Sequence, residues 1–330
     1  MLKVGLISAW HVHAKGYANL LVESKDVEIA AVWDEDPIRG EKWAKSLGAT
    51  WISDYDRFLA EGDFTAVVCN SPTTMHPELL IKAAEAKKHI FTEKLLATNV
   101  AECEQLCKAI LDNGVIFTVS LPVRMASYVL YVRKLIQEGT LGRVTGGRFH
   151  RSHSGVSDNW LPDYWYDVSK TGGGAMMDLG AHPVYILSFL LGEPKRIAGL
   201  TSNVYGTTSD ENAIGLIEFE DGVIATAETA FVTYGVPDIL EIYGTSGSVF
   251  VRNGEVQVVT KVAAELGISS YTPAASAMPA GRAEPLLQFV EACTNNSGTP
   301  EFLGTHDALV MTKIIEAIYQ SDETGMTVTL

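Results

Sequence analysis

Hydrophobic residues in the first 120 positions of the chain form short, nearly continuous runs. These runs are LKVGLIS (2–8), VEIAAVWD (27–34), FTAVVCNS (64–71), KHIFTEK (88–94) and VIFTVSL (115–121). In the segments between them, hydrophobic residues recur every three or four positions, as on one face of a helix. These segments are 14–25, 36–48, 75–88 and 99–114. Apolar strands that alternate with helices predict an α/β domain whose parallel sheet is covered by helices on both faces.

After residue 121 the spacing of hydrophobic residues changes. Helical spacing recurs over 124–142 and 175–192, and a strand pattern lies between them at 144–153. Further along, short strand-like runs are joined by three hairpin signals, which are Asp221-Gly222, the segment 244–248 and Asn253-Gly254. An antiparallel meander of this kind, together with the helices, predicts a second domain of the α+β class.

Length and composition agree with two domains. The chain has 330 residues, of which 47% are hydrophobic and 20% charged, as in an ordinary globular protein. We expect the first domain to span 1–121 and the second 122–304, and a final helix and strand at 305–330 could pack on either one. The net charge of −15 argues against a nucleic-acid or anionic-membrane partner, because both require a basic face.

The cysteines and the N-terminus indicate a cytoplasmic protein. Cys69, Cys103, Cys107 and Cys293 have neither the spacing of a zinc site nor the density of a disulfide framework, so we expect reduced, buried thiols. The first residues, MLKVGLISAW, lack a basic segment followed by a cleavable apolar stretch, and no run of about 18 apolar residues occurs.

Polar residues follow the ends of the predicted parallel strands. Ligands bind beyond the carboxyl ends of such strands, which places 8–13, 70–74, Asp34 and Glu93-Lys94 on one rim. An acidic residue after the second strand accepts hydrogen bonds from the adenosine ribose of a dinucleotide and repels a 2′-phosphate, so Asp34 favours NAD over NADP. The alternative is that the acidic stretch at 34–36 only caps the next helix.

The loop after the first strand differs from the usual glycine-rich dinucleotide loop. Ser8, Trp10 and His13 stand at the three positions that glycine occupies in G-x-G-x-x-G. The amides and the dipole of the following helix remain available to a phosphate, but Trp10 places a large side chain where the backbone would approach it. His11 and His13 could bind phosphate, substrate or a metal, or only pack. We expect no metal site, since no spacing supports a third ligand such as His182.

Three further residues have side chains suited to catalysis. Lys94 follows a strand, where its ammonium group could stabilise negative charge on a substrate oxygen, or it is an ordinary surface lysine. Asp178 and His182 are four residues apart and are expected on one helix face, where Asp178 could orient His182 as a general base. The glycines at 172–174 would let a ligand or the other domain approach the backbone closely. The alternative for Asp178 and His182 is an ordinary pair on the surface.

Two segments resemble the Gfo/Idh/MocA family, named for glucose–fructose oxidoreductase and inositol dehydrogenase. SPTTMHPELLIKAAEAKKHIFTEKLLAT resembles the stretch that carries the family's Glu-Lys-Pro motif, and TGGGAMMDLGAHPVYIL resembles its glycine-rich segment followed by Asp-x-x-x-His. The motifs occur in the family's order across most of the chain. The resemblance implies a Rossmann domain and a second domain with a large open sheet for substrate binding and for assembly into homodimers or homotetramers.

The resemblance also implies NAD(P)-dependent oxidation of a sugar or cyclitol hydroxyl. Carried over by motif, Lys94, Asp178 and His182 are the expected catalytic residues: His182 takes the hydroxyl proton, Lys94 holds the hydroxyl and Asp178 supports His182. The expected cofactor-binding residues are Ser8, Ala9, Trp10, His11, Val12, His13, Asp34, Asn70, Ser71, Pro72, Thr73, His76, Glu93 and Lys94. The expected substrate-binding residues are Arg124, His153, Trp165, Asp178 and His182.

Three departures from the family pattern bear on these expectations. The first is the loop, in which His11-Val12-His13 indicates a branch with His-x-His in place of the glycines. The second is Leu95, which replaces the proline after Glu93-Lys94. The third is Tyr185, which stands one helical turn after His182 where many relatives have a polar or acidic residue, and it suggests a different substrate.

Aromatic residues precede the glycine triplet. Trp160, Tyr164, Trp165 and Tyr166 follow the histidines His150 and His153, and aromatic faces of this kind stack on sugar rings. A loop folded onto the domain interface or a neighbouring subunit is the alternative.

Three functions are consistent with these residues. The first is an NAD-dependent dehydrogenase that acts on a carbohydrate-like polyol. The second is an enzyme that retains NAD and uses transient oxidation to cleave a glycosidic bond or eliminate water. The third is a ligand-binding or regulatory protein with a vestigial nucleotide site. The identity of the sugar, the hydroxyl and the direction of reaction are not encoded in any pattern that we recognise.

Overall fold

The apolar runs of the N-terminal part form one parallel sheet of six strands. The strands are β1 (Leu2–Ile7), β2 (Val27–Trp33), β3 (Thr50–Trp51), β4 (Ala66–Cys69), β5 (His89–Thr92) and β6 (Phe117–Val119). Their order in the sheet is β3-β2-β1-β4-β5-β6, and every neighbouring pair is parallel. The sequence-based prediction of a Rossmann sheet is therefore confirmed. Only the two-residue strand β3 was missed, because so short a segment carries no hydrophobic pattern.

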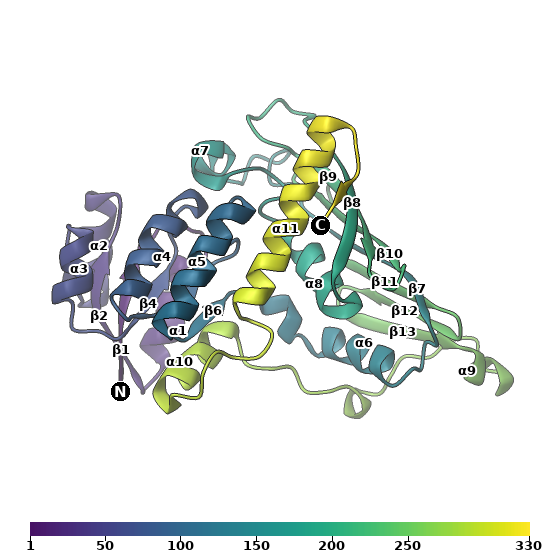
Figure 1. Ribbon diagram of the computed structural model, residues 1–330. Coiled ribbons are helices and arrows are strands. Elements are labelled where there is room, and N and C mark those ends of the chain that lie inside the picture. Colours follow the sequence, from purple (N-terminus) through teal and green to yellow (C-terminus); the bar gives the residue numbers. More distant parts are fainter. The chain divides into compact units, whose positions relative to one another are not determined.

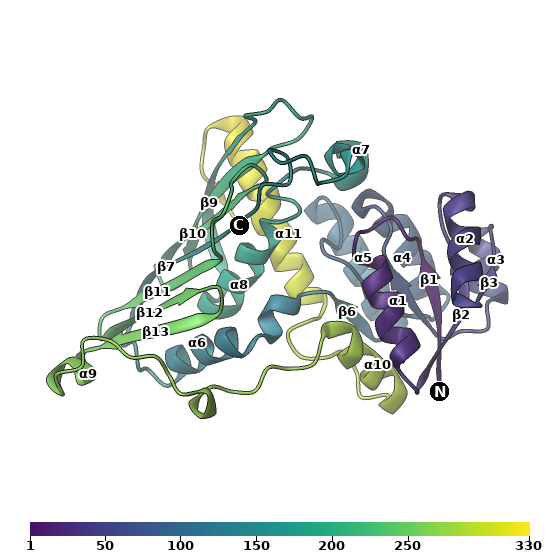
Figure 2. The same cartoon turned by 180° about the vertical axis from the view of Figure 1, so that it is seen from behind.

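Helices cover this sheet on both faces. They are α1 (Ala14–Glu23), α2 (Pro37–Leu47), α3 (Tyr55–Glu61), α4 (His76–Glu85), α5 (Val100–Asn113) and α10 (Pro285–Asn295). Figure 1 shows α4 and α5 in front of the strands, and Figure 2, the reverse view, shows α1 in front of them. Asp36 caps α2 by accepting hydrogen bonds from the amides of Ile38 and Arg39, and Gly48 ends it in the left-handed conformation.

The computed structural model describes residues 1–330, and these divide into two units. The first unit contains 1–120 and 283–309, and the second contains 121–282 and 310–330. Helix α10 lies in the first unit because Leu286 and Phe289 are buried in the same core as the strands β1 and β4. The segment 283–304, expected in the second domain, is thus part of the first unit. Its amphipathic pattern shows that it forms a helix but not which core it joins.

The second unit is built on a sheet of eight strands. They are β7 (Val144–Ser152), β8 (Pro194–Ser202), β9 (Asn212–Phe219), β10 (Ile224–Ala230), β11 (Ile239–Gly244), β12 (Gly247–Arg252), β13 (Glu255–Thr260) and β14 (Val328–Thr329). Their order is β13-β12-β11-β7-β10-β9-β8-β14. The three expected hairpins are present, but β7 and β10 pair in parallel, so the sheet is mixed and mostly antiparallel.

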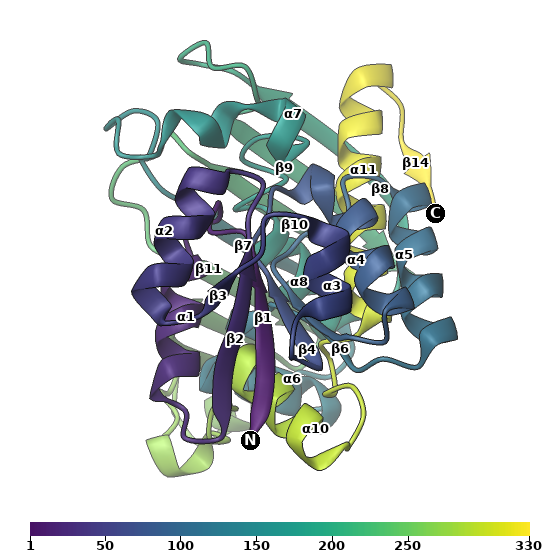
Figure 3. The same ribbon diagram turned by 90° about the vertical axis from the view of Figure 1, so that its left-hand side faces the viewer.

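One face of this sheet is covered by helices. The helical segments of the unit are η2 (Pro122–Met125), α6 (Ser127–Gln137), η3 (Asp163–Tyr166), α7 (Val168–Thr171), α8 (Ala181–Leu191), α9 (Lys261–Glu265) and η4 (Ala275–Ala277). Figure 3 shows α6 and α8 on the same side of the strands, and α8 contacts β7 and β10. The long helix α11 (Thr305–Thr324) continues from the first unit into the second, where Ile318 lies against Gly199 and Gly215 of the sheet.

The helix expected over 175–192 is shorter in the structure. Helix α8 starts at Ala181, and the residues from Gly174 to Gly180 form a series of turns. A buried carboxylate binds the backbone of these turns, as described below, and this local contact replaces helical hydrogen bonds. None of the helices is both long and apolar enough to cross a membrane.

Candidate functional site

The loop between β1 and α1 keeps the turn of a dinucleotide-binding loop without its glycines. Ser8 adopts a φ of 63°, a left-handed conformation that usually requires glycine. Its hydroxyl accepts a hydrogen bond from the amide of Trp10 at 3.0 Å, which stabilises the turn locally. The Trp10 side chain is buried, 7% exposed, and its ring lies 6.2 Å from that of His11. It therefore does not fill the space above the loop, which answers the steric question that the sequence raised.

Most amides of this loop already have partners within the protein. The amide of Ala9 donates to Asp34, that of His11 to the carbonyl of Asn70 and that of His13 to the Nδ1 atom of His11. In a glycine-rich loop such amides are directed at the pyrophosphate. This chain thus offers fewer backbone donors to a phosphate than a glycine-rich loop does.

Asp34 lies at the carboxyl end of β2 and is paired with an arginine. Its two carboxylate oxygens accept hydrogen bonds from Arg39, from Nε at 3.0 Å and from Nη2 at 2.6 Å. The same Nη2 atom also donates to Glu35 at 2.6 Å and lies 3.4 Å from the hydroxyl of Ser8. Asp34 is buried. The carboxylate also accepts from the amides of Ala9 and Asp36, so its role toward ribose stays a prediction, and Arg39 is a second polar group at this position that the sequence analysis missed.

The side-chain carboxamide of Asn70, on this rim, has no hydrogen-bond partner within the protein. Its side chain is fully buried, and neither its Oδ1 nor its Nδ2 atom forms a hydrogen bond within the protein. Buried polar groups are almost always paired, because an unpaired one costs about 1–3 kcal/mol. A bound polar group beside the loop would satisfy this carboxamide, so the rim fits a dinucleotide despite its altered loop.

The segment after β4 is tied to the segment after β5 by His76. The ring of His76 is fully buried, with Nδ1 at 2.8 Å from the carbonyl of Leu95 and Nε2 at 3.2 Å from the carbonyl of Ser71. Burial lowers the pKa of His76, so the ring is neutral. A neutral ring has one N–H and therefore donates to only one of these two carbonyls, of which Leu95 is the nearer. His76 thus links the two segments, and its contact with a cofactor stays a prediction. Pro72 is buried and Thr73 is half-buried beside it.

A cluster of polar side chains surrounds Glu93 at the end of β5. The carboxylate of Glu93 is 2.7 Å from Nδ1 of His13 and 3.9 Å from Nδ1 of His11, and the hydroxyl of Tyr17 also donates to it. Tyr17 in turn contacts the hydroxyl of Ser120 at 2.7 Å. Burial acts to raise the pKa of Glu93, but the neighbouring His11 and His13 rings outweigh it and hold that pKa well below its usual range.

Lys94 follows this cluster directly. Its amide donates to the other carboxylate oxygen of Glu93 at 3.2 Å, and its side chain is buried rather than on the surface. The peptide bond between Lys94 and Leu95 is cis. Lys94 belongs to the first unit, whereas Asp178 and His182 belong to the second.

The turns before α8 are held by the buried carboxylate of Asp210. Its oxygens accept hydrogen bonds from the amides of Gly174 at 2.7 Å and Met176 at 2.8 Å, and from the hydroxyl of Tyr319 at 2.8 Å. A Cβ on Gly174 would lie 2.1 Å from the carbonyl oxygen of Asp210. The glycine is required by this contact within the second unit, and not by the approach of a ligand or of the other domain.

Asp178 lies in these turns and not on α8 with His182. Its Oδ2 atom accepts a hydrogen bond from the indole of Trp165 at 2.9 Å. Trp165 is buried, while Trp160 and Tyr164 of the same segment are exposed. Trp165 therefore fixes the carboxylate of Asp178, and the expectation that Asp178 and His182 share one helix face is wrong because α8 begins after Asp178.

His182 is held by Tyr185 at the start of α8. The Nδ1 atom of His182 is 2.6 Å from the hydroxyl of Tyr185, and that hydroxyl accepts a hydrogen bond from the amide of Val123 at 3.3 Å. Burial raises the pKa of Tyr185, so the phenol keeps its proton. Because the amide can only donate, the phenol proton points to Nδ1 of His182. A neutral His182 ring in this contact carries its own proton on Nε2.

Two of the expected substrate-binding residues are engaged within the second unit. The guanidinium group of Arg124 is buried and donates to the carbonyl of Tyr185, from Nε at 3.1 Å and from Nη2 at 3.0 Å. His153 is stacked on Phe231 with ring centroids 4.9 Å apart, and Nδ1 of His153 accepts from the amide of Gly155. Arg124 thus anchors α8 to η2, and His153 is part of the loop packing.

Four residues of these clusters were not identified from the sequence. Tyr17 follows His13 by four residues on α1, and this spacing was a usable signal for a shared helix face. Arg39 follows Asp34 by five residues. Asp210 contacts Gly174 across 36 residues of chain, and Tyr319 contacts Met177 across 142. No sequence pattern connects residues that are so far apart.

Comparison with known proteins assigns the two halves of the chain to one family. Residues 2–121 match a family described as an oxidoreductase family with an NAD-binding Rossmann fold, and residues 129–250 match the GFO/IDH/MocA C-terminal domain. The chain is 27% identical to the scyllo-inositol 2-dehydrogenase (NAD(+)) of Bacillus subtilis (strain 168), over 99% of this chain and 95% of that protein. It is also 27% identical to the 2,7-anhydro-N-acetylneuraminate hydratase of Escherichia coli (strain K12), over 76% of this chain and 67% of that protein.

A solved structure has the same fold. Levoglucosan dehydrogenase, in complex with NADH and levoglucosan, matches with a TM-score of 0.86 at 23% sequence identity, covering 99% of each chain.

Proposed function

Because the chain belongs to the Gfo/Idh/MocA family of oxidoreductases, we propose that it transfers hydride between a CH–OH group of a sugar or polyol and NAD. The observation that carries the proposal is the pair of anchored side chains in the second unit. Asp178 is fixed by Trp165 and His182 by Tyr185. A ligand-binding protein has no need to fix both an acid and a histidine, whereas proton transfer requires both to be positioned.

The proposed roles follow from the chemistry of each side chain. In the oxidative direction the hydroxyl proton of the substrate goes to Nε2 of His182, and the ammonium group of Lys94 holds the same oxygen. The nicotinamide, when bound, supplies the hydride acceptor. Because the neutral His182 ring rests with its proton on Nε2, that proton must first pass to water while Nδ1 takes a proton from water, and the Tyr185 oxygen then accepts a hydrogen bond from Nδ1. The phenol therefore supports the protonated ring as well as the neutral one.

The proposed cofactor is NAD, held by the rim of the first unit. Asp34 would accept from the ribose hydroxyls, the carboxamide of Asn70 would pair with a polar group of the nucleotide, and the loop from Ser8 to His13 would face the phosphates. Some backbone amides of this loop already donate hydrogen bonds within the protein, which supports the alternative of a regulatory protein with a vestigial nucleotide site. The hydratase among the relatives supports the other alternative, in which retained NAD serves an elimination or hydration. It stays a prediction that the His-x-His loop defines a separate branch of the family.

A nucleotide titration tests this proposal. We expect the purified protein to bind NADH at about micromolar Kd and NADPH more weakly, measured by nicotinamide fluorescence or calorimetry. Asp34→Asn should weaken NADH binding by about tenfold, because a hydrogen bond to a charged group contributes about 1.5–3 kcal/mol. Asp36→Asn is the matched control, since Asp36 caps α2 and asparagine caps equally well.

The outcomes separate the three functions. NADH that exchanges freely and is oxidised or reduced with a polyol supports the dehydrogenase. Nucleotide that is released only on denaturation, without net turnover, supports the NAD-retaining enzyme. Absence of binding and of released nucleotide contradicts both and leaves the regulatory protein.

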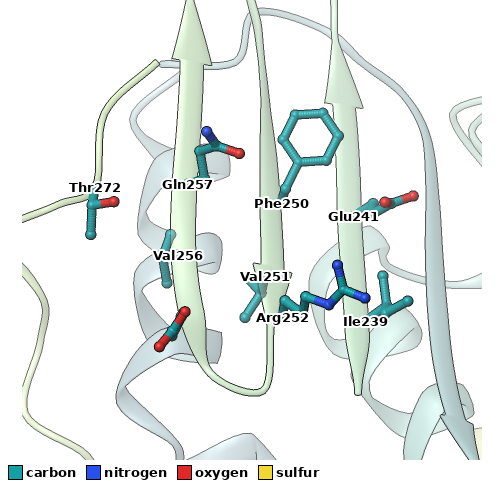
Figure 4. Close-up of a pocket in the computed structure, with 9 residues that line it drawn as sticks. Ile239, Glu241, Phe250, Val251, Arg252, Val256, Gln257 and Thr272 are labelled. Atoms are coloured by element: carbon teal, nitrogen blue, oxygen red, sulfur yellow. The ribbon is translucent and has the colours of Figure 1, made fainter. Parts of the chain in front are cut away.

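We also propose that the uncovered face of the eight-stranded sheet mediates assembly into a homodimer or homotetramer. The register places one row of side chains across five strands of this face: Leu216, Thr226, Arg148, Glu241 and Phe250. Leu200, Ile214, Leu216 and Ile224 on the same sheet are exposed. An exposed apolar face of this kind marks an interaction site. Near its other edge, Phe250 and Gln257 project beside a hollow of about 430 Å³ (Figure 4).

Leu216→Lys tests this face. Placing a charge in an apolar interface should convert the oligomer to smaller species, as measured by light scattering after size exclusion at several concentrations. Ile38→Lys, at an exposed apolar residue of the first unit, is the control. A monomeric wild-type protein, or an oligomer that is unchanged by Leu216→Lys, would refute the assignment.

A further inference from the structure

His11, His13 and Glu93 form a group of metal-binding side chains to which the proposed reaction assigns no chemical step. Their ligand atoms all lie within 4.8 Å of one another. We propose that these residues form a binding site for a divalent transition-metal ion such as Zn²⁺. This inference goes beyond the proposed function, because it requires neither a nicotinamide nor a sugar. The sequence alone did not support it, since only His11 and His13 are neighbours and the third ligand comes from the end of β5.

The spacing of the ligand atoms is close to that of a coordinated ion. Zinc–nitrogen and zinc–oxygen bonds of about 2.0–2.2 Å in a tetrahedral site separate neighbouring ligand atoms by roughly 3.3 Å. Here Nδ1 of His13 is 2.7 Å and Nδ1 of His11 is 3.9 Å from the same oxygen of Glu93. One distance is shorter and the other longer than required by roughly 0.6 Å, a difference that small side-chain rotations accommodate. An ion would then replace the hydrogen bond between His13 and Glu93.

The ligands are supported as metal ligands are in known sites. The carboxylate of Glu93 accepts hydrogen bonds from the hydroxyl of Tyr17 and the amide of Lys94, which fix its orientation. Nδ1 of His11 accepts a hydrogen bond from the amide of His13 at 3.2 Å, so this nitrogen carries a lone pair and no proton, and an ion bound to it would replace that hydrogen bond. Outer partners such as Tyr17 and the amide of Lys94 orient the ligands and raise the affinity for metal.

The burial of the three residues leaves one side of the site open. His11 and Glu93 are buried, with side chains 7% and 2% exposed, whereas the side chain of His13 is 52% exposed. Three protein ligands with an open position are typical of catalytic zinc sites, in which water or a substrate oxygen completes the coordination. Two imidazoles and one carboxylate suit zinc, cobalt, nickel or ferrous iron, and not calcium or magnesium, which prefer oxygen ligands.

Metal binding to the nucleotide-free protein tests the proposal. Protein treated with chelator and then dialysed against Zn²⁺ should retain one equivalent per chain, and Co²⁺ should give the visible absorption of a nitrogen-ligated tetrahedral ion. His13→Gln should weaken Zn²⁺ binding by roughly 100-fold, and His11→Gln should have a similar effect. His306→Gln, at the start of α11, is the matched control for binding to a histidine outside the cluster.

Each outcome decides the question. Because the His13 side chain is exposed, His13→Gln should fold as the wild type does, and a circular dichroism spectrum verifies this. Retention of one equivalent by wild type and by His306→Gln, but not by His13→Gln, supports the site. Less than stoichiometric binding by wild type, or equal binding by His13→Gln, overturns it. Because no nucleotide is present, these results do not depend on whether the protein binds NAD.

Discussion

Replacing His182 with alanine lowers turnover with a polyol or sugar substrate by about 10²–10⁴-fold and leaves the Kd for NADH within about twofold. The loss is expected because a positioned general base contributes this much to a proton-transfer step. The Kd is expected to hold because the cofactor-binding residues that we propose lie in the first unit, whereas His182 lies in the second. Steady-state kinetics and a fluorescence titration of the same preparation measure the two quantities.

Tyr185→Phe provides a graded comparison at the same place. It removes the hydroxyl that contacts Nδ1 of His182 and keeps the aromatic ring in the core. We expect a fall in turnover of about fivefold, since one neutral hydrogen bond contributes about 1 kcal/mol. Nitrogen NMR of the histidine rings should show the neutral His182 ring with its proton on Nε2 in wild type and a mixture of both forms in Tyr185→Phe.

The two measurements distinguish a catalytic from a structural role. If turnover of His182→Ala stays within tenfold of wild type, His182 is not the base. A fall in turnover of Tyr185→Phe without any change in the ring proton would mean that the phenol acts on packing and not on His182.

The sequence predicted the strands of the first unit because parallel strands are buried on both faces and leave uninterrupted apolar runs. It also predicted the hairpins at Asp221-Gly222 and Asn253-Gly254, where the turn chemistry is local. Parallel strands end at one edge of a sheet, so the residues of the rim, from Ser8 to Lys94, could be placed together without knowing their contacts.

What the sequence did not predict depends on contacts between distant segments. Helix α8 starts only at Ala181, because Asp210 binds the backbone of the preceding turns in place of helical hydrogen bonds. The partner of His13 is Glu93, which β5 brings to the loop across 80 residues. Helix α10 joins the first unit through Leu286 and Phe289, whose spacing shows an apolar face but not the core that receives it.

Replacing Asp210 with alanine should lower the free energy of unfolding by about 3 kcal/mol or more and reduce turnover as well. The variant removes three acceptor contacts, with the amides of Gly174 and Met176 and with the hydroxyl of Tyr319, and hydrogen bonds to a charged group contribute about 1.5–3 kcal/mol each. Turnover should fall because the turns that carry Asp178 lose their anchor. Urea unfolding followed by circular dichroism measures the first effect and steady-state kinetics the second.

Two further variants identify the cause of this loss. Asp210→Asn keeps one oxygen for Gly174 and Tyr319 but turns an NH₂ group toward the amide of Met176, so it should destabilise the protein less than Asp210→Ala. Gly174→Ala crowds the backbone of Asp210 as well as its carboxylate, because the added Cβ would lie 2.1 Å from the backbone carbonyl oxygen and 2.8 Å from Oδ1. If both variants act on one contact, the double variant Gly174→Ala/Asp210→Ala loses less stability than the sum of the two single losses. Additive losses would show that the carboxylate and the glycine stabilise the turns independently. Unchanged turnover in Asp210→Ala would show that the position of Asp178 does not depend on Asp210.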